Sequence, residues 1–193
     1  MLDFIRERVT AYRPRQIEPE GRPRAAVLLL LYNKDGQHHL LFTRRTDLVE
    51  HHKGQISFPG GAADPGDRDL RGTGLRETYE ELGIAPEDVD IFGPLDEWIT
   101  VSNFVVTPFA GAITRPAPYP FRPNHFEVAE LLEVPILHLQ DDANVVSEWR
   151  RLGDRDILTY TYRWGDHLIW GVTARMLKHF LDLLTSEAPP ERT

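Results

Sequence analysis

The stretch from Gly60 to Ile84 reads GGAADPGDRDLRGTGLRETYEELGI. Its pattern predicts a helix from about Asp67 to Leu82, with a glycine directly after it at the left-handed terminus. Three glutamates of this helix, Glu77, Glu80 and Glu81, stand at positions i, i+3 and i+4. At roughly 100° per residue they share one narrow face, so the sequence predicts a cluster of carboxylates on a rigid element.

This acidic cluster is either a solvated surface or a site for a hard divalent cation, which prefers carboxylate oxygens. Glu80 and Glu81 lie in the last helical turn, where the macrodipole disfavours negative charge by ~0.3–1 kcal/mol per group. Like charges at these spacings add repulsion of ~0.2–0.5 kcal/mol per pair. A bound cation would reverse both penalties. Local rules broken without visible compensation therefore favour a functional site.

The residues RETYEELGI, from Arg76 to Ile84, resemble the core of the Nudix box, Arg-Glu-apolar-x-Glu-Glu-x-Gly-apolar. Gly61 and Asp67 look like the opening glycine and the acidic position of the same box. The acidic position is Asp rather than Glu, eight residues rather than seven separate it from Arg76, and Thr78 replaces an aliphatic residue. We expect the insertion to lengthen the loop before the helix without moving the glutamates.

The resemblance implies a Nudix hydrolase with an α+β fold, in which a mixed β-sheet lies between helices and the box forms a loop–helix–loop. It implies that Glu77, Glu80 and Glu81 bind Mg²⁺ or Mn²⁺, and that the Gly61 carbonyl completes the shell. The implied reaction is attack of water on one phosphorus of a pyrophosphate. Metal suits this reaction because it neutralises phosphate oxygens and lowers the pKa of bound water.

Two further groups are candidates for catalysis. Arg76 is expected to hold a glutamate in its metal-binding rotamer through a forked hydrogen bond. The general base is either Glu77 or Glu127, because the base in some Nudix enzymes lies on a later loop. The alternative for Glu127 is an acid at the start of a short helix, where the helix dipole favours negative charge.

A second signature precedes the box: LFTRRT at Leu41 to Thr46, then Gly54, then FPGG at Phe58 to Gly61. It resembles the pattern upstream of the box in coenzyme A pyrophosphatases. The residues IWGVTARML, from Ile169 to Leu177, also resemble that subfamily. The subfamily implies a small-molecule substrate, coenzyme A or an acyl derivative, and the products 3′,5′-ADP and 4′-phosphopantetheine.

One departure bears on the substrate, because Glu50 stands where the subfamily pattern has its second arginine. Coenzyme A carries a 3′-phosphate, whose recognition requires cationic donors. Glu50 keeps open a Nudix hydrolase for ADP-ribose, NADH or dinucleoside polyphosphates. A ligand-sensing Nudix domain without catalysis is a third alternative, which the intact glutamates disfavour. The candidate substrate contacts nearby in sequence are Arg44, Arg45, His51, His52 and Lys53.

The composition excludes several other classes. The net charge of −8 argues against a nucleic-acid partner, and the absence of cysteine removes thiolate nucleophiles and zinc–thiolate sites. No apolar stretch approaches the ~20 residues of a membrane span, and the N-terminus lacks a secretory signal, so a cytoplasmic protein is expected. The oligomeric state is left open. Four tryptophans are each more typical of a core than of a platform for adenine: Trp98, Trp149, Trp164 and Trp170.

The remaining patterns predict one domain over the 193 residues, with a core at about residues 24–184. Helices are expected at residues 2–13 and 172–184, and a short helical stretch at 127–132. Loops are expected at 46–65 and 115–123. Strands are expected at 24–32, 39–45, 89–92, 97–101, 104–113, 159–164 and 167–170.

Overall fold

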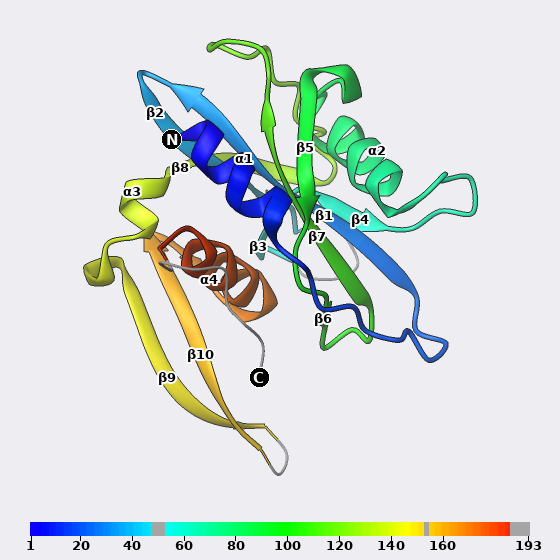
Figure 1. Cartoon of the computed structure of the whole chain (residues 1–193), viewed down its shortest axis with the longest axis vertical. Coiled ribbons are helices and arrows are strands. Elements are labelled where there is room, and N and C mark those ends of the chain that lie inside the picture. The colour runs from blue at the N-terminus through cyan, green and yellow to red at the C-terminus, as the bar shows by residue number, and fades with distance from the viewer. Residues whose placement is uncertain (48–52, 153–154, 186–193) are drawn as a thin grey trace.

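The strand β1 (Arg24–Lys34) lies at the centre of the protein. Its four consecutive leucines, residues 28–31, are buried, and alternate ones belong to the two hydrophobic clusters on opposite faces of the sheet. Side chains of a strand alternate between faces, so an uninterrupted apolar run indicates a strand covered on both sides. The computed structural model describes residues 1–47, 53–152 and 155–185 (Figure 1).

The main sheet is mixed, as expected: β1 pairs with β7 in parallel and its other pairings are antiparallel. The strand order is β3-β2-β1-β7-β5, with β4 beside β1, β6 beside β7 and β8 beside β2. The remaining strands of this sheet are β2 (Gln37–Arg45), β3 (Ile56–Ser57), β4 (Gly60–Ala62), β5 (Val89–Pro94), β6 (Trp98–Ile99), β7 (Val105–Ile113) and β8 (Val128–Pro135).

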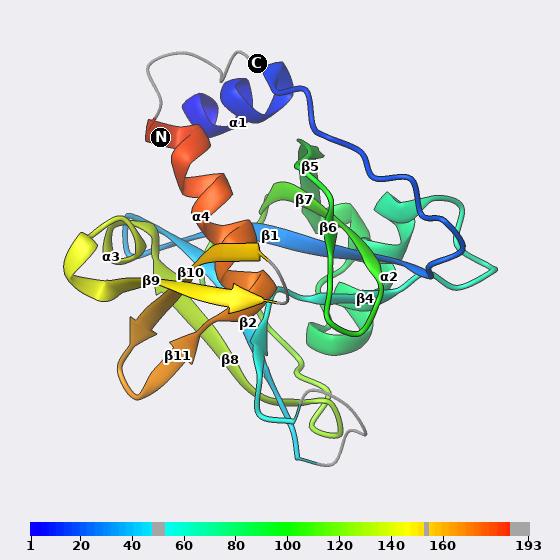
Figure 2. The ribbon, with the colours of Figure 1, turned by 90° about the horizontal axis from the view of Figure 1, so that it is seen from below.

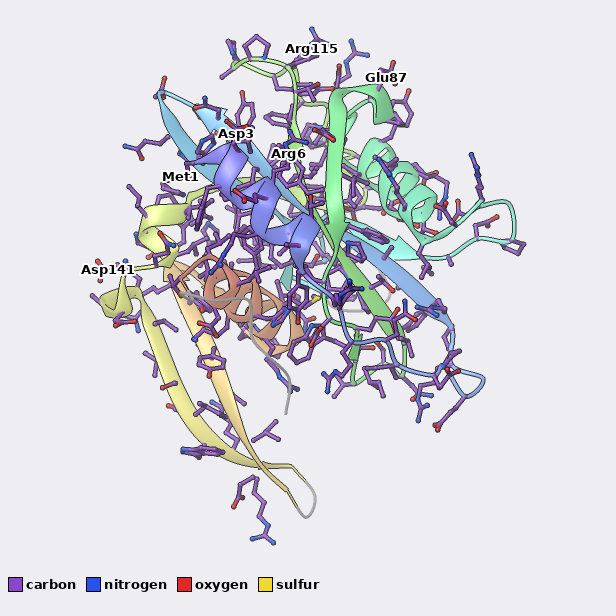
Figure 3. All side chains as sticks on the ribbon, in the orientation of Figure 1. Met1, Asp3, Arg6, Glu87, Arg115 and Asp141 are labelled. Carbon is purple, nitrogen blue, oxygen red and sulfur yellow. The ribbon has the colours of Figure 1, made fainter. Side chains whose placement is uncertain are left out.

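Helices cover both faces of this sheet, which confirms the predicted Nudix architecture (Figure 2). The helix α2 (Leu70–Leu82) lies on one face, and α1 (Leu2–Ala11) and α4 (Gly171–Thr185) lie on the other. Arg6 anchors α1 to β5 by an ion pair with Asp90 and by stacking over the ring of Phe92 (Figure 3). Short helical segments are α3 (Ile136–Leu139) and the 3₁₀ turns Pro86–Asp88 and Asp142–Asn144.

A second, antiparallel sheet of three strands contains β9 (Val145–Leu152), β10 (Arg155–Trp164) and β11 (His167–Ile169). The β9–β10 hairpin extends away from the rest of the molecule (Figure 1). Trp149 on this hairpin is 71% exposed and Trp170 is 52% exposed, so the expectation of a core position is wrong for both. Within the described ranges, no helix is long and apolar enough to cross a bilayer.

The helix α2 begins three residues later than predicted, because Asp69 caps it. The Asp69 carboxylate accepts a hydrogen bond of 2.7 Å from the Gly72 amide, which satisfies a donor that the first turn leaves free. The predicted end is confirmed: Gly83 has a left-handed conformation with φ of 68°.

The short helix predicted at residues 127–132 is wrong, because these residues begin β8. This strand pairs with β2 along its length, and it buries Val128, Leu132 and Val134. A local pattern that suits either element is decided by such long-range pairing. The segment predicted as a loop at 46–65 contains β3 and β4, the strand predicted at 97–101 is confined to Trp98–Ile99, and β9 was not predicted.

Candidate active site

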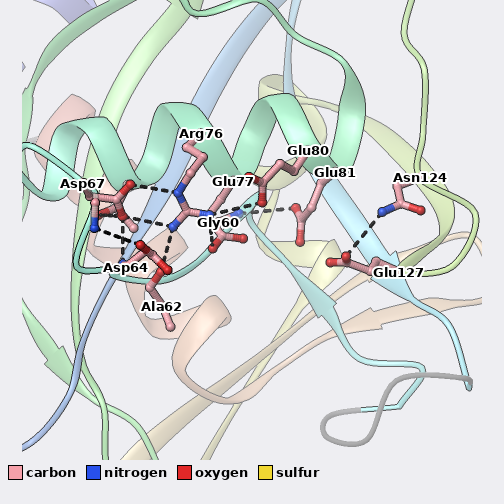
Figure 4. Close-up of polar contacts among 12 residues, drawn as sticks. Gly60, Ala62, Asp64, Asp67, Arg76, Glu77, Glu80, Glu81, Asn124 and Glu127 are labelled. Carbon is pink, nitrogen blue, oxygen red and sulfur yellow. Dashed lines mark hydrogen bonds and ion pairs between the residues drawn. The ribbon is translucent and has the colours of Figure 1, made fainter.

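The three glutamates of α2 lie on the side of the helix that faces β4 and the segment before β8 (Figure 4). Their environments differ although they share a helix face. Glu81 is buried, Glu77 is half-buried and Glu80 is exposed. Within about one helical turn, the solvent exposure of these carboxylates therefore ranges from buried to exposed.

Two glycines bring β4 against both β1 and the helix. Gly60 has φ of 146°, and a methyl group there would collide with the backbone carbonyl of Ala26. A methyl group at Gly61 would collide with the Glu77 carboxylate. Only glycine allows this backbone conformation and close approach, so the FPGG stretch places the β4 backbone beside Glu77. The role of the Gly61 carbonyl as a metal contact stays a prediction.

Glu81 is a buried carboxylate with little compensation. Burial raises its pKa to about 8, while the charge of Arg45 and a hydrogen bond from the Gly60 amide act in the opposite direction. That hydrogen bond is long, at 3.3 Å. Burial also raises the pKa of Glu77, against the effect of its hydrogen bond from Arg76. An incompletely neutralised buried anion is what a bound cation would stabilise.

Arg76 joins the loop of the box to its glutamates. Its Nε donates to Asp67 Oδ1 at 2.8 Å and its Nη2 to Asp67 Oδ2 at 3.0 Å. Its Nη1 donates to Glu77 Oε1 at 2.9 Å and to Glu80 Oε2 at 3.1 Å. The predicted fork to a glutamate is therefore wrong, because the fork binds Asp67 and a single nitrogen contacts the two glutamates.

Asp67 is more firmly held than its departure from the family pattern suggested. The hydrogen bonds from Arg76, and lesser ones from the Asp64 amide and the Thr73 hydroxyl, hold the pKa of its carboxyl well below its usual range. The shorter side chain and the extra loop residue thus still allow a two-point contact with the arginine. The inserted residue therefore does not prevent the contact between Asp67 and Arg76.

Glu127 lies directly before β8 and faces α2 (Figure 4). Asn124 Nδ2 donates to its carboxylate at 3.3 Å, and the backbone carbonyl of Glu127 accepts a hydrogen bond of 2.9 Å from the Thr46 amide. Its charge contributes to raising the pKa of both Glu77 and Glu81, so the carboxylates are near one another. The structure thus brings Glu127 to the glutamates of the box, which the sequence offered only as one alternative.

The predicted substrate contacts differ in their surroundings. Arg44 is paired with Glu130, with Nε and Oε2 3.2 Å apart, so this arginine already has a carboxylate partner. Arg45 is half-buried beside Glu81, and within the described residues it has no side-chain hydrogen bond or ion pair. Lys53 is exposed. Glu50, His51 and His52 lie outside the described residues.

The donor set fits a hard divalent cation, although the conformation seen is not that of a closed metal site. In the part of the chain that the structure describes, no three acidic or histidine side chains converge closely enough to hold an ion. Glu80 turns toward Arg76 instead. The buried Glu81, the half-buried Glu77 and the adjacent β4 backbone nevertheless offer oxygen donors, which magnesium and manganese prefer.

Asn124 is a site residue that the sequence analysis missed. It holds Glu127 through its amide nitrogen, and its backbone amide donates to the Glu81 carbonyl at 2.8 Å. It thereby connects the end of α2 with the candidate base. No spacing in the sequence distinguishes this asparagine from an ordinary loop residue, because its partners are far away along the chain.

Comparison with known proteins agrees with this fold. The family model of the NUDIX domain matches residues 22–151. The uncharacterized Nudix hydrolase NudL of Pectobacterium atrosepticum is 37% identical over 97% of this chain and 95% of its own. The human mitochondrial coenzyme A diphosphatase NUDT8 is 36% identical over 83% of this chain and 69% of its own.

Solved structures show the same fold. A Nudix hydrolase of M. smegmatis, RenU, has a TM-score of 0.51 at 24% identity, over 63% of this chain and 74% of its own. A MutT/nudix family protein of Enterococcus faecalis has a TM-score of 0.53 at 15% identity, over 85% of this chain and 62% of its own. The chain belongs to the Nudix family, and it is a Nudix pyrophosphohydrolase.

Proposed function

We propose that this Nudix hydrolase cleaves the diphosphate of coenzyme A, or of an acyl derivative, to 3′,5′-ADP and 4′-phosphopantetheine. Nudix hydrolases act on small nucleoside diphosphate derivatives and generally use divalent metal ions. The observation that carries the substrate is the 36% identity to a coenzyme A diphosphatase over 83% of the chain. The upstream signature at Leu41 to Gly61 resembles the same subfamily.

In this proposal Glu77, Glu80 and Glu81 hold Mg²⁺ or Mn²⁺, and the Gly61 carbonyl adds a neutral oxygen. When bound, the metal neutralises the diphosphate and lowers the pKa of its water. Arg45 binds a diphosphate oxygen, because its guanidinium lies at the site and has no acceptor within the described residues. Other side chains of the site orient these groups and accept one proton from the attacking water.

Arg76 acts as a positioning residue. Its two-point contact with Asp67 fixes the guanidinium, and the fixed guanidinium directs Nη1 at Glu77 and Glu80. The arginine therefore limits the rotamers that the glutamates sample before the ion binds.

We assign the general base to Glu127, with Glu77 as the alternative. Glu127 faces the glutamates of α2, Asn124 orients its carboxylate, and Arg76 does not bind it. Its other carboxylate oxygen, which has no partner among the described residues, can accept a proton from the attacking water without giving up a charge that holds metal.

A second enzymatic function, hydrolysis of ADP-ribose, NADH or dinucleoside polyphosphates, is favoured by one observation. Glu50 replaces an arginine of the coenzyme A pyrophosphatase pattern. An acidic side chain there would repel rather than attract the 3′-phosphate of coenzyme A.

Purified protein, incubated with Mg²⁺ and a panel of diphosphates, tests the proposal. The panel contains coenzyme A, acetyl-coenzyme A, ADP-ribose, NADH and diadenosine tetraphosphate, and the products are separated by chromatography. We expect 3′,5′-ADP and 4′-phosphopantetheine from coenzyme A, at a rate above that of ADP-ribose. Cleavage of ADP-ribose or NADH with intact coenzyme A would contradict it.

Two further expectations stay predictions. We expect a single domain over the 193 residues, with a core at about residues 24–184. We also expect a cytoplasmic location.

A further inference from the structure

The outer edge of β9 has no partner strand among the described residues. Its sheet has the order β11-β10-β9, so only β10 pairs with β9, and β11 covers only Tyr162–Trp164 of β10. β9 is the outer strand of the hairpin that extends away from the molecule (Figure 1). The N–H and C=O groups of such an edge can pair with another strand, and a two-stranded ribbon is marginally stable by itself. The hairpin therefore has the properties of an interaction surface.

The side chains of β9 agree with an edge that another chain covers. All residues from Val146 to Arg151 are exposed, and the exposed fraction is 71% for Trp149 and 49% for Val146. Soluble proteins protect a free edge with proline, lysine or a bulge. β9 contains neither proline nor lysine, and its register with β10 is unbroken. A large indole on an edge without these devices indicates a contact surface, because tryptophan is enriched at interfaces.

Symmetry restricts how two copies of β9 can pair. Two copies of one strand join edge to edge in antiparallel orientation, about a twofold axis perpendicular to the sheet. This rotation leaves each side chain on its own face of the sheet, and directly opposite residues share a face. Because successive residues alternate between faces, one residue of β9 must lie opposite its own copy. Each choice of that central residue defines one register.

The charges of β9 distinguish these registers. A register centred on Glu148 opposes two carboxylates, and one centred on Arg150 or Arg151 opposes two guanidinium groups, which destabilises a sheet. A register centred on Ser147 places no opposite charges across from one another. The register centred on Trp149 places Glu148 of each copy opposite Arg150 of the other. These two residues share a face, since Glu148 Oε2 and Arg150 Nη2 are 3.0 Å apart within one strand. Charge complementarity therefore selects the register centred on Trp149.

We propose that the chain forms a symmetric homodimer, in which the β9 strands of two copies pair antiparallel with Trp149 opposite its own copy. The pairing joins both hairpins into one continuous sheet, and the aromatic pair and the Glu148–Arg150 pairs stabilise it. The hairpin lies apart from α2 in Figure 1, so the dimer does not depend on the proposed function. One strand edge is small for a protein interface, and the dimer should therefore dissociate on dilution.

Sedimentation velocity at about 1 to 100 μM protein tests the association. The dimer fraction of wild type should rise with concentration. Trp149→Ala should weaken the dimer about tenfold or more, because it removes the central contact. At the lowest concentration its melting temperature should equal that of wild type, since the side chain is exposed in the monomer. Wild type that stays monomeric over the whole range would overturn the proposal, and so would a dimer that Trp149→Ala leaves unchanged.

Charge exchange tests the pairing across the interface. Glu148→Arg and Arg150→Glu should each weaken the dimer about tenfold or more, because each places like charges opposite one another twice. A mixture of the two variants should dimerise again, since every arginine then lies opposite a glutamate. Asp166→Arg, at an exposed position in the turn between β10 and β11, is the matched control and should dimerise like wild type. Undiminished dimers of the single variants, or a mixture that stays monomeric, would contradict the pairing.

Single cysteines test the register, because the chain has no cysteine of its own. Opposite Cα atoms of an antiparallel pair are about 4.5–5.5 Å apart, a distance that a disulfide can bridge. Trp149→Cys should therefore form a covalent dimer under mild oxidation, visible on a non-reducing gel. Ser147→Cys is the matched control on the same face of β9: its two copies would be offset by about 14 Å along the strands, so it should remain monomeric on the gel. Equal crosslinking of both variants, or crosslinking of neither, would overturn the proposed pairing.

Discussion

Glu77 and Glu81 show how one helix face can carry two different carboxylates. Glu77 keeps a hydrogen bond of 2.9 Å from Arg76, whereas the Glu81 carboxylate accepts only the long contact from Gly60 among the described residues. Both have a raised pKa because both are withdrawn from water. Because their partners differ, the two glutamates should differ in how they affect turnover and the stability of the metal-free protein.

Replacement of the candidate ligands and of the candidate base should have distinguishable effects. Glu77→Gln and Glu81→Gln should each lower kcat by about a hundredfold or more and weaken Mn²⁺ binding, because each removes a charge that holds metal. Glu127→Gln should lower kcat by ~10²–10⁴-fold with Mn²⁺ affinity nearly unchanged. Glu87→Gln, at an exposed glutamate, is the control. Full activity in Glu127→Gln would return the role of base to Glu77.

The raised pKa of Glu81 predicts how the metal-free protein responds to pH. Its folded pKa of about 8 lies above the ~4.3 of an unfolded chain, so the folded state binds the proton more tightly. Folding stability therefore falls as pH rises between these values, and the loss is complete above the folded pKa. In chelator, Glu81→Gln should be more stable than wild type at pH ~8, by ~1–3 kcal/mol.

Thermal melts of wild type and Glu81→Gln at the two ends of this pH range check that prediction. The advantage of the variant should shrink toward the acidic end, where wild-type Glu81 is protonated in both states. A variant that is less stable than wild type at the alkaline end would show that Glu81 is well compensated without metal.

At the scale of elements, the site depends on how closely β4 approaches β1 and on where α2 ends. The FPGG stretch permits the close approach of β4. Gly60 places no side chain against the β1 backbone, and Gly61 places none against the Glu77 carboxylate. The cap at Asp69 fixes where α2 begins, and the left-handed Gly83 fixes where it ends. Together they place Glu80 and Glu81 in the last helical turn. Strand and helix can be perturbed separately.

Gly60→Ala should cost ~2–4 kcal/mol of folding stability, because the methyl group adds a backbone collision to the strain of a positive φ. Gly36→Ala is the matched control, since Gly36 also has a positive φ, 75°, but has open space around it. It should cost only ~1 kcal/mol. Urea unfolding of both variants measures the difference. Equal losses would show that the close approach of β4 is not tightly packed.

Divalent metal should stabilise the fold through the end of α2. At a hundredfold excess over its dissociation constant, Mg²⁺ or Mn²⁺ should add ~2.7 kcal/mol to the free energy of unfolding. The double replacement Glu80→Gln, Glu81→Gln should abolish this gain, whereas Glu87→Gln should keep it. A metal-dependent thermal shift that persists in the double variant would place the ion elsewhere.

At the scale of the whole molecule, the sequence predicted what depends on local pattern. The apolar run of β1, the end of α2 at Gly83 and the shared helix face of the glutamates followed from local pattern. β8 was misread as a helix because pairing with β2 decides its conformation, and β9 was missed because its residues are largely exposed and lack an apolar alternation.

The same limit applied to the site. The fork of Arg76 with Asp67, the orientation of Glu127 by Asn124 and the occupation of Arg44 by Glu130 all join residues that only the fold brings together. A bulge between Arg44 and Arg45 in the pairing of β2 with β8 also separates two adjacent arginines that the sequence treated alike. One is bound to a carboxylate, and the other lies at the glutamates.

The ratio of kcat/KM for coenzyme A to that for ADP-ribose, in excess Mg²⁺, tests the central claim most directly. Glu77→Gln, which should remove both activities, controls for a contaminating hydrolase. The account predicts a ratio of about tenfold or more in favour of coenzyme A, since each 1.36 kcal/mol of transition-state binding corresponds to tenfold. Faster cleavage of ADP-ribose would contradict the coenzyme A assignment, and the protein would remain a Nudix pyrophosphohydrolase of another substrate.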